Sequence, residues 1–140
     1  MDKVKISIGA STFLAAWETE LSPKTCFAFK AALPFSQKII HARWSGEACW
    51  IPLGTLNFGV GPENPTSRPK PGQILFYPAG DSETEILVPY GATRFSSSAG
   101  ELAGNRILTI TDRLDELARL GKEILWKGSR EIRFEVAEFA

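Results

Sequence analysis

Short apolar segments separated by turn residues make up most of this chain. Apolar and polar side chains alternate over residues 4–8 and again over 132–136. A period of two places every second side chain on the same face, which predicts a half-buried β-strand near each end of the chain. Further segments have strand-like composition: 12–20, 38–44, 47–53, 73–77, 83–88 and 106–111. Together the pattern predicts about eight strands.

Residues 22–33 have the spacing of a helix instead. Their apolar side chains form one broad stripe, which we expect to be buried: Cys26, Phe27, Phe29, Ala31 and Leu33. Ser22 is suited to cap the first turn by accepting a hydrogen bond from a backbone N–H, and Pro23 fits the first helical position. Pro34 ends the segment. Such a helix needs a sheet to cover, so we expect it to plug one end of a β-barrel.

A second helix is predicted over residues 112–120. Apolar residues recur there three and four positions apart, at Leu114, Leu117 and Ala118. Asp112 is a suitable N-cap, and Gly121 stands where the residue after a helix is often glycine.

The connections between strands differ in length. Ser45 and Gly46 are predicted to form a two-residue hairpin turn. Residues 54–72 form a long loop rich in Gly and Pro, and loops of that length are often functional. Pro89 and Gly91 are predicted to end the strand before them, and residues 94–105 have the composition of a loop.

These elements predict a mainly β fold. We expect a closed, mostly antiparallel β-barrel of about eight strands with two short helices. The chain has no internal repeat and no linker-like stretch, so residues 1–140 are interpreted as one domain.

Composition narrows the function classes. The 16 Lys and Arg residues balance 16 Asp and Glu residues, so no net field attracts nucleic acid or an anionic membrane. No apolar segment approaches the ~18 residues of a membrane span, and the first strand begins without a signal sequence. We therefore expect a cytoplasmic protein with no nucleic-acid or membrane partner.

No cofactor, metal site or disulfide is expected. His41 is the only histidine in the sequence, and with two scattered cysteines it does not supply the roughly four closely spaced ligands of structural zinc. Cys26 and Cys49 stand among apolar residues, as small buried hydrophobic residues do. Phosphate-binding glycine loops and the motifs of nucleophilic hydrolases are absent from the sequence.

Charged residues on neighbouring predicted strands are the candidates for a ligand site. Glu83 and Glu85 have the same parity, so their carboxylates leave one face about 7 Å apart, a spacing suitable for acid and base roles. Leu87 shares that face and would help enclose Glu85, whereas a solvent-exposed face is the alternative. Arg43 is placed on a strand, where it either forms a structural ion pair with Glu85 or Glu47 or binds an anionic group.

We expect one concavity lined by Arg43, Glu47, Tyr77 and Glu85. Together they suit a small, polar, planar ligand with an amide-like or carboxylate group. The alternative is an internal hydrogen-bonded core without a cavity. Further ligand-binding candidates lie in loops: Glu63 and Asn64 between prolines of the long loop, and Arg94 after a predicted strand end.

Several stretches resemble cyclophilin-like proteins. Cyclophilins begin their first helix with a motif similar to Pro23-Lys24-Thr25 followed by Phe29-Lys30-Ala31. A bacterial family of small cyclophilin-like barrel proteins without assigned function has a pattern similar to Pro71-Gly72-Gln73-Ile74-Leu75-Phe76-Tyr77-Pro78, and the segment from His41 to Gly54 is also similar. The resemblance covers most of the chain and implies a cyclophilin-like barrel of eight strands capped by helices. It implies no substrate.

The residues of prolyl isomerases are not matched. Arg43 and Gly46 fit the isomerase arginine and glycine only after a one-residue shift, which on a strand changes the face. With Gly46 aligned, Glu47 stands in place of an apolar Phe and Trp50 in place of a Gln. The later Trp and His of that family have no counterpart, so we do not expect isomerase activity.

Three functions of different classes remain. The first is a small-molecule binding barrel, accessory to amide or cyclic-amide metabolism by analogy with other cyclophilin-like barrels. The second is a carboxylate-based enzyme of hydrolase or isomerase type, and the third is an oligomeric interaction module that uses the 54–72 loop. Because the sequence has four Trp and nine Phe residues, we expect exposed apolar surface and self-association as a homo-oligomer.

Overall fold

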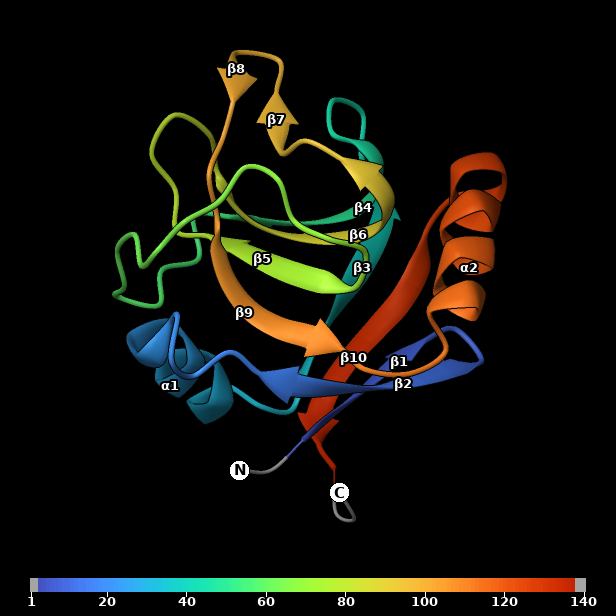
Figure 1. Cartoon of the computed structure of the whole chain (residues 1–140), viewed down its shortest axis with the longest axis horizontal. Coiled ribbons are helices and arrows are strands. Elements are labelled where there is room, and N and C mark those ends of the chain that lie inside the picture. The colour runs from blue at the N-terminus through green and yellow to red at the C-terminus, as the bar shows by residue number, and fades with distance from the viewer. Residues whose placement is uncertain (1–2, 138–140) are drawn as a thin grey trace.

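The computed structural model of this chain describes residues 3–137 and has a closed β-barrel at its centre (Figure 1). The barrel strands are β1 (Val4–Ile8), β2 (Ser11–Trp17), β3 (Phe35–His41), β4 (Gly46–Gly54), β5 (Gln73–Tyr77), β6 (Thr84–Thr93), β9 (Asn105–Ile110) and β10 (Arg130–Val136). Around the barrel their order is β1, β10, β3, β4, β6, β5, β9 and β2. All of these pairings are antiparallel. The predicted eight-stranded antiparallel barrel is confirmed.

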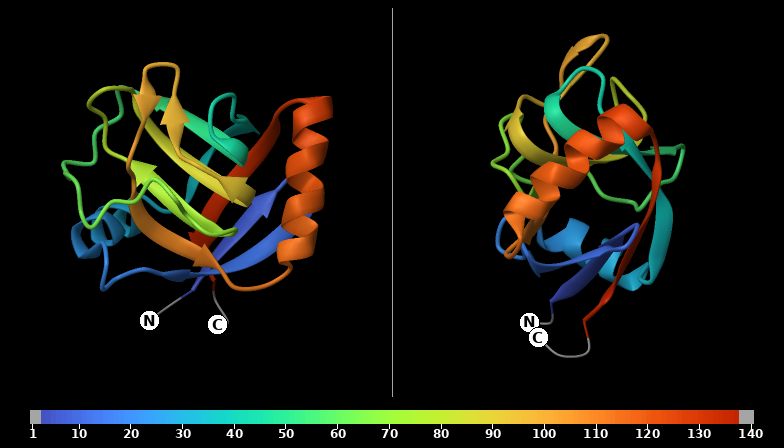
Figure 2. Two further views of the ribbon diagram at one scale, coloured as in Figure 1. Left: turned by 45° about the horizontal axis from the view of Figure 1, so that its top comes forward. Right: turned by 90° about the vertical axis from the view of Figure 1, so that its right-hand side faces the viewer.

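Two helices and a small hairpin complete the fold. Helix α1 (Pro23–Ala31) lies at one end of the barrel, and α2 (Leu114–Lys127) lies along another side (Figure 2). The short strands β7 (Ser96–Ser97) and β8 (Gly100–Glu101) form a separate hairpin within the predicted 94–105 loop. Within residues 3–137, neither helix has the length and apolar character that crossing a membrane requires.

Helix α1 closes its end of the barrel with one aromatic side chain. Phe29 is 1% exposed and belongs to the main core, together with inward-facing residues of β1 and β10. The predicted stripe was too broad, because Phe27 points away from the barrel and is 80% exposed. A helix that rests on a barrel end buries a narrow face, and Cys26 and Phe29 occupy it.

The cap of α1 comes from a distant residue and not from Ser22. The Ser22 hydroxyl is buried and has no hydrogen-bond partner among the described residues. Instead, the Glu63 carboxylate accepts hydrogen bonds from the backbone N–H groups of Lys24 (3.1 Å) and Thr25 (2.7 Å) and from the Thr25 hydroxyl (2.7 Å). A carboxylate there satisfies free N–H groups and also interacts favourably with the helix dipole.

Helix α2 begins and ends later than predicted. The Asp112 carboxylate accepts a hydrogen bond from the Leu14 N–H (2.9 Å) instead of capping the helix, which starts at Leu114. The helix continues through Gly121 and stops before Gly128, whose φ is +93°. Gly121 therefore serves packing, because the missing side chain lets the helix backbone approach the barrel.

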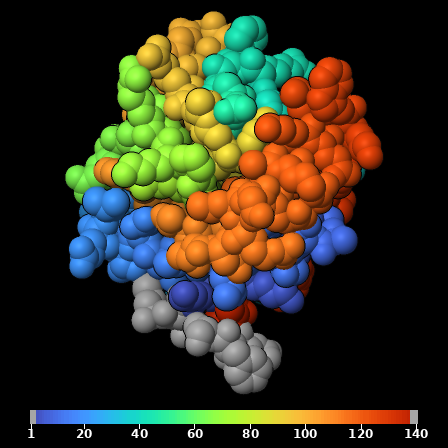
Figure 3. Space-filling view, turned by 45° about the vertical axis from the view of Figure 1, so that its right-hand side comes forward, coloured from blue at the N-terminus to red at the C-terminus, as the bar shows by residue number. Residues whose placement is uncertain are grey.

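The packing partner of Gly121 is the ring of Tyr90 on β6. A Cβ at position 121 would lie 2.7 Å from Cγ of Tyr90, closer than real contacts allow. Figure 3 shows α2, in orange to red, next to the yellow atoms of the 84–93 region. The close approach joins α2 to the barrel wall.

We expect Gly121→Ala to destabilise the protein by about 1 kcal/mol. Alanine is the better helix former by about 1 kcal/mol, but overpacking against a buried ring costs about 1–3 kcal/mol. Urea unfolding followed by circular dichroism measures the difference. In a Tyr90→Ala background the same substitution should become neutral or stabilising, and destabilisation in both backgrounds would contradict the packing argument.

Two strand boundaries near the cavity also differ from the prediction. Strand β3 ends at His41, and residues 42–45 form a loop in place of the predicted two-residue turn. Strand β6 continues through Pro89 and Gly91 to Thr93. Proline is tolerated because the β4 to β6 register shifts between Gly46 and Ala48, beside the Pro89 pairing, and bulges accommodate a missing N–H.

Candidate functional site

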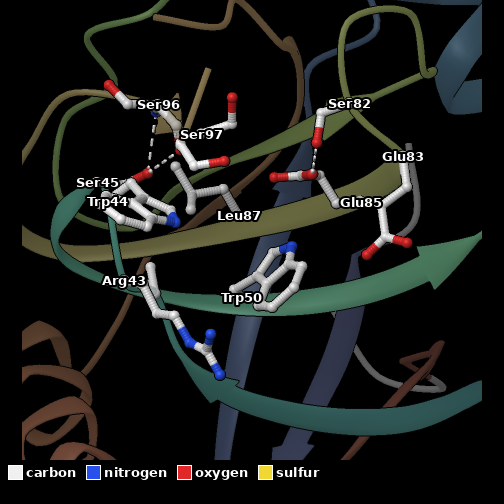
Figure 4. A pocket seen from close by; sticks show the side chains of 12 residues that line it. Arg43, Trp44, Ser45, Trp50, Ser82, Glu83, Glu85, Leu87, Ser96 and Ser97 are labelled. Atoms are coloured by element: carbon white, nitrogen blue, oxygen red, sulfur yellow. Dashed lines mark hydrogen bonds between the residues drawn. The ribbon is translucent and has the colours of Figure 1, made fainter. Parts of the chain in front are cut away.

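A cavity of about 210 Å³ lies on the outer face of β4 and β6 (Figure 4). The inner face of the same strands belongs to the barrel core, with Ile51, Ile86 and Val88. The alternate residues of β4 and β6 point outward, because successive side chains of a strand lie on opposite faces of the sheet. The cavity is lined by Ala42, Arg43, Trp44, Ser45, Trp50, Ser82, Glu83, Glu85, Leu87, Ser96, Ser97 and Ser98.

The wall opposite β4 is fixed by hydrogen bonds between two loops. The buried Ser45 hydroxyl donates to the Ser96 carbonyl (3.2 Å) and accepts from the Ser96 N–H (3.0 Å). The Arg94 N–H donates to the Ser45 carbonyl (3.1 Å). A second hydrophobic cluster shares Leu87 with the cavity lining and contains Ala48, Leu75, Tyr77, Leu87, Phe95 and Leu102. The cavity is therefore part of an ordered layer outside the barrel.

Glu85 is the buried carboxyl group of the cavity. It is 5% exposed, and its Oε2 accepts a hydrogen bond from the Ser82 hydroxyl (3.3 Å). Burial raises the pKa of Glu85 to about 7, the Ser82 hydrogen bond acts in the opposite direction, and the nearby Glu83 charge raises it further. The carboxyl group is thus able to give or take a proton near neutral pH.

Trp50 brings an unpaired donor to the same place. Its indole N–H is buried and has no hydrogen-bond acceptor in the described part of the chain. In Figure 4 the indole nitrogen lies on the side of the ring that faces Glu85. The indole N–H lowers the pKa of Glu85, an effect smaller than that of burial, although the two groups are not in hydrogen-bond geometry. A buried N–H without a partner is costly, so this donor is available to a ligand.

Arg43 and Glu83 also line the cavity. The ion pair of Arg43 with Glu85 or Glu47, one of the two alternatives for Arg43, does not form within residues 3–137. Arg43 lies in the 42–45 loop and not on a strand, and its guanidinium group extends past Trp50 and away from Glu85 (Figure 4). Both side chains are exposed, and neither has a hydrogen bond or ion pair with another residue of 3–137.

Tyr77 and Glu47 make structural contacts outside the cavity lining. The Tyr77 hydroxyl accepts a hydrogen bond from the Asp81 N–H (2.9 Å), and its ring packs edge-on against Phe95. Glu47 accepts a hydrogen bond from the Ala92 N–H (2.9 Å). The structure therefore brings two of the four residues of the predicted concavity, Arg43 and Glu85, into one cavity.

The loop candidates also have partners within the fold. Burial would raise the pKa of Glu63, but the hydrogen bonds from Thr25 and Lys24 outweigh it and lower the pKa. The Asn64 side chain donates to the Leu21 carbonyl (2.8 Å). Arg94 forms an exposed ion pair with Glu101 (3.6 Å). These residues hold loops in place and lie outside the cavity lining.

The site residues that were not predicted are mostly tryptophans and serines. Trp44 lies at the cavity and is 60% exposed, and Trp50 contributes the free N–H. The serines come from two loops: Ser45, Ser82, Ser96, Ser97 and Ser98. Trp50 could have been recognised from strand parity, because it points outward from β4 and pairs with Leu87 on β6, the strand that also contains Glu85. That inference requires the register between β4 and β6 to be known.

Thiol and metal chemistry have little support from the described residues. Cys26 and Cys49 are free and buried, and burial raises their thiol pKa values to about 11 and about 12. Thiols are weak nucleophiles in that state. Within residues 3–137, no group of three or more His, Cys, Asp and Glu side chains is placed to hold a metal ion.

Comparisons with known proteins agree on the fold. The structure of McbB in complex with tryptophan is similar with a TM-score of 0.74 and 17% identity, over 98% of this chain and 45% of McbB. The solution structure of the hypothetical protein AF2241 from Archaeoglobus fulgidus is similar with a TM-score of 0.59 and 16% identity, over 97% of this chain and 95% of that protein. At these identities the likeness shows the fold alone, which is cyclophilin-like.

This chain spans less than half of the McbB chain, so more than half of McbB has no counterpart here. Comparison of sequences identifies the family of the chain. No curated protein matches the chain significantly. A family described as "Protein of unknown function (DUF3830)" matches residues 4–136.

Proposed function

The chain belongs to the DUF3830 family of proteins of unknown function, and from its cavity we propose that it binds a small, planar organic molecule with an amide group. The observation that supports this proposal most strongly is the buried Glu85 carboxyl beside the unpaired Trp50 N–H. An amide carries an N–H donor and a carbonyl acceptor in one plane. Its N–H would donate to Glu85 and its carbonyl would accept from Trp50.

The size of the cavity favours a ligand smaller than a typical drug. Its volume of about 210 Å³ is below the roughly 300–1,000 Å³ of pockets for drug-sized molecules. Leu87 and the two tryptophan rings offer apolar contact, and the serine hydroxyls of the 96–98 segment offer polar contact at the rim. A lactam, a cyclic ureide or a small primary amide has this combination of properties.

The charges favour an amide over a carboxylate. Glu83 and Glu85 both line the cavity, whereas the Arg43 guanidinium is directed away from Glu85. A ligand carboxylate near two glutamates would be repelled, and one of the three acids would need a proton. Of the two ligand types expected from the sequence, amide-like and carboxylate-bearing, we therefore propose the amide.

A role accessory to amide or cyclic-amide metabolism follows from this ligand class by analogy of fold. McbB was solved in complex with tryptophan, a small molecule with a planar ring, which is the kind of ligand proposed here. Catalysis by a carboxylate is a second candidate, favoured by the Glu85 pKa of about 7.

We also propose a cytoplasmic location and self-association. The two free cysteines are what a reducing compartment permits. Phe27 on α1 and Trp126 on α2 are 80% and 85% exposed, and contact with a second copy would remove such surface from water.

A matched ligand set tests the binding proposal by thermal shift. Benzamide and benzoate have the same shape and differ in the amide and carboxylate groups, and hydantoin and 2-pyrrolidone add a cyclic ureide and a lactam. At a concentration near 100 Kd, a binding amide should add about 2.7 kcal/mol of stability, which raises Tm by several degrees. Benzoate should give little or no shift at pH 8, where Glu85 is mostly ionised.

Variants locate the bound amide. Trp50→Phe keeps a ring but removes the N–H, and losing that hydrogen bond should weaken amide binding by about 1 kcal/mol or more. Trp126→Phe is the matched control, because Trp126 is exposed on α2 and is not part of the cavity lining. If no amide stabilises the protein, or if Trp50→Phe and Trp126→Phe bind equally well, this assignment fails.

A further inference from the structure

The two groups proposed to bind the amide, Glu85 and Trp50, also have the chemical character of a base and a hydrogen-bond donor. Among residues 3–137 the Glu85 carboxyl accepts a hydrogen bond from the Ser82 hydroxyl at Oε2, and the nearby Trp50 indole N–H lowers its pKa. The Trp50 N–H is a buried donor without an acceptor. Glu85 is 5% exposed, and Leu87 and Trp50 line the same cavity. A buried carboxyl group and a buried donor without an acceptor thus lie in one cavity.

This pairing has the parts required for removing a proton from carbon. A base must accept the proton of a carbon next to a carbonyl, and a donor must stabilise the negative charge that develops on the carbonyl oxygen. A carboxylate base works best near neutral pH when burial raises its pKa, and burial does so for Glu85. The carbonyl of the proposed amide ligand already points to Trp50, which is where such charge would develop.

We propose that this cavity catalyses proton transfer at the carbon next to the carbonyl of a bound cyclic amide or ureide, with Glu85 as the base and Trp50 as the oxyanion donor. The proposal rests on the binding function proposed above. It names an activity for the cavity and identifies its substrates as cyclic amides that carry a hydrogen on that carbon.

The step is balanced without a co-reactant. The C–H bond breaks, its proton goes to Oε1 of Glu85, and its electron pair forms a C=C bond to the carbonyl carbon. The carbonyl pair moves to oxygen, which accepts a hydrogen bond from the Trp50 N–H. After the proton on Glu85 has exchanged with solvent, its return to the same face of the carbon restores the amide. The net result is exchange of that hydrogen with solvent, with the configuration of the carbon retained.

The charged groups around Glu85 set the expected pH dependence. Asp81 and Glu83 lie in the turn before β6, Tyr77 on β5 is paired with Glu85, and Arg43 lines the cavity from the 42–45 loop. Tyr77 is occupied by the Asp81 N–H. Because the base must be ionised, the rate should rise with pH through about 7 and then level off.

The test follows 5-methylhydantoin in D₂O by proton NMR. This probe is a small planar ureide with one hydrogen on the carbon beside its carbonyl. With the protein present, we expect its C5–H signal to disappear at least tenfold faster than in buffer. Because Glu85 returns the proton to the face that it left, the L-enantiomer should lose its optical rotation no faster than in buffer.

Binding is measured separately by thermal shift with the same probe. Glu85→Gln keeps the shape of the side chain but has no basic oxygen, so exchange should fall to the buffer rate. Trp50→Phe should slow the protein-dependent exchange at least tenfold. Glu131→Gln, on the exposed face of β10, is the control and should leave exchange unchanged.

The outcomes separate the two proposals. Hydantoin binding without faster exchange, or exchange that persists in Glu85→Gln, would overturn the catalytic inference and leave binding intact. No thermal shift with the probe or with the other amides would overturn both. Loss of exchange in Glu85→Gln, with a thermal shift still present at saturating probe, supports Glu85 as the base.

Discussion

Replacing Phe29 with alanine is expected to lower the free energy of unfolding by about 3–5 kcal/mol, as is typical of a large aromatic core residue. Phe29 is 1% exposed and comes from α1, yet its ring lies among the side chains of the barrel. Its ring centroid is between 5.2 and 6.3 Å from four other aromatic rings, those of Trp17, Phe35, Phe58 and Phe134. Removing it leaves a cavity at the end of the barrel that the rigid strands cannot fill.

Phe27→Ala is the matched control, because it makes the same chemical change two residues away on the same helix. Phe27 is 80% exposed, and surface substitutions usually change stability by less than about 0.5 kcal/mol. Urea unfolding followed by circular dichroism compares the two variants. Similar losses in both, or a loss below about 1 kcal/mol in Phe29→Ala, would show that α1 does not close the barrel through this side chain.

The barrel was predictable because its strands have a strong local signal. Over β1 the buried residues are Val4, Ile6 and Ile8, exactly every second position, and β10 buries Ile132 and Phe134 in the same way. Once one face of each strand is apolar, the strands must close around those faces, and the order of turns limits how they pair. The first helix was also predictable, since Pro23 and Pro34 bound it.

The predicted helix caps and ends were wrong where a residue distant in the sequence determines them. Glu63 caps α1 from 38 residues away in the sequence, measured to Thr25. Gly121 has the sequence signature of a helix end, but the ring of Tyr90 requires a glycine there inside the helix. In both cases the local rule is sound and a tertiary contact overrides it, and no local pattern in the sequence contains that contact.

The candidate site also combines residues that local patterns predict with residues that only the tertiary structure brings to it. Glu85 and Leu87 line one cavity because strand parity places them on one face, as predicted, and Glu83 lines it from the residue before β6. Arg43 also lines it, but from a loop, because β3 ends at His41. The role of Trp50 depends on the pairing of β4 with β6, where Trp50 is opposite Leu87. Local periodicity does not reveal which strands pair when the two strands are not consecutive in the sequence.

The position of the cavity has a consequence for any ligand. An eight-stranded barrel has just enough interior room for its own side chains, and here those side chains are large and buried: Phe13, Phe29, Phe76 and Phe134. The concavity therefore forms on the outside, where the 94–104 segment and the 42–45 loop build a second layer over β4 and β6. Binding residues in such a site come from loops, which vary more readily than strands.

Asn105→Ala is expected to cost about 3 kcal/mol, the second large effect. The fully buried Asn105 side chain on β9 accepts a hydrogen bond from the Glu63 N–H (2.8 Å) and donates to the Thr25 hydroxyl (2.9 Å) and the Gly61 carbonyl (2.9 Å). Alanine removes all three bonds and leaves buried polar groups unpaired, each costing roughly 1 kcal/mol or more.

Asn57→Ala provides the comparison, because its exposed side chain accepts one local hydrogen bond, from the Gly59 N–H (2.7 Å). We expect that variant to lose less than about 1 kcal/mol. Since Asn105 links β9 to α1 and to the long loop, Asn105→Ala should also speed proteolytic cleavage within residues 54–72 in the folded protein. Urea unfolding and limited proteolysis are the two measurements. Unchanged stability would mean that solvent replaces the three bonds, and unchanged cleavage would mean that the loop is held by Glu63 and its cap of α1 alone.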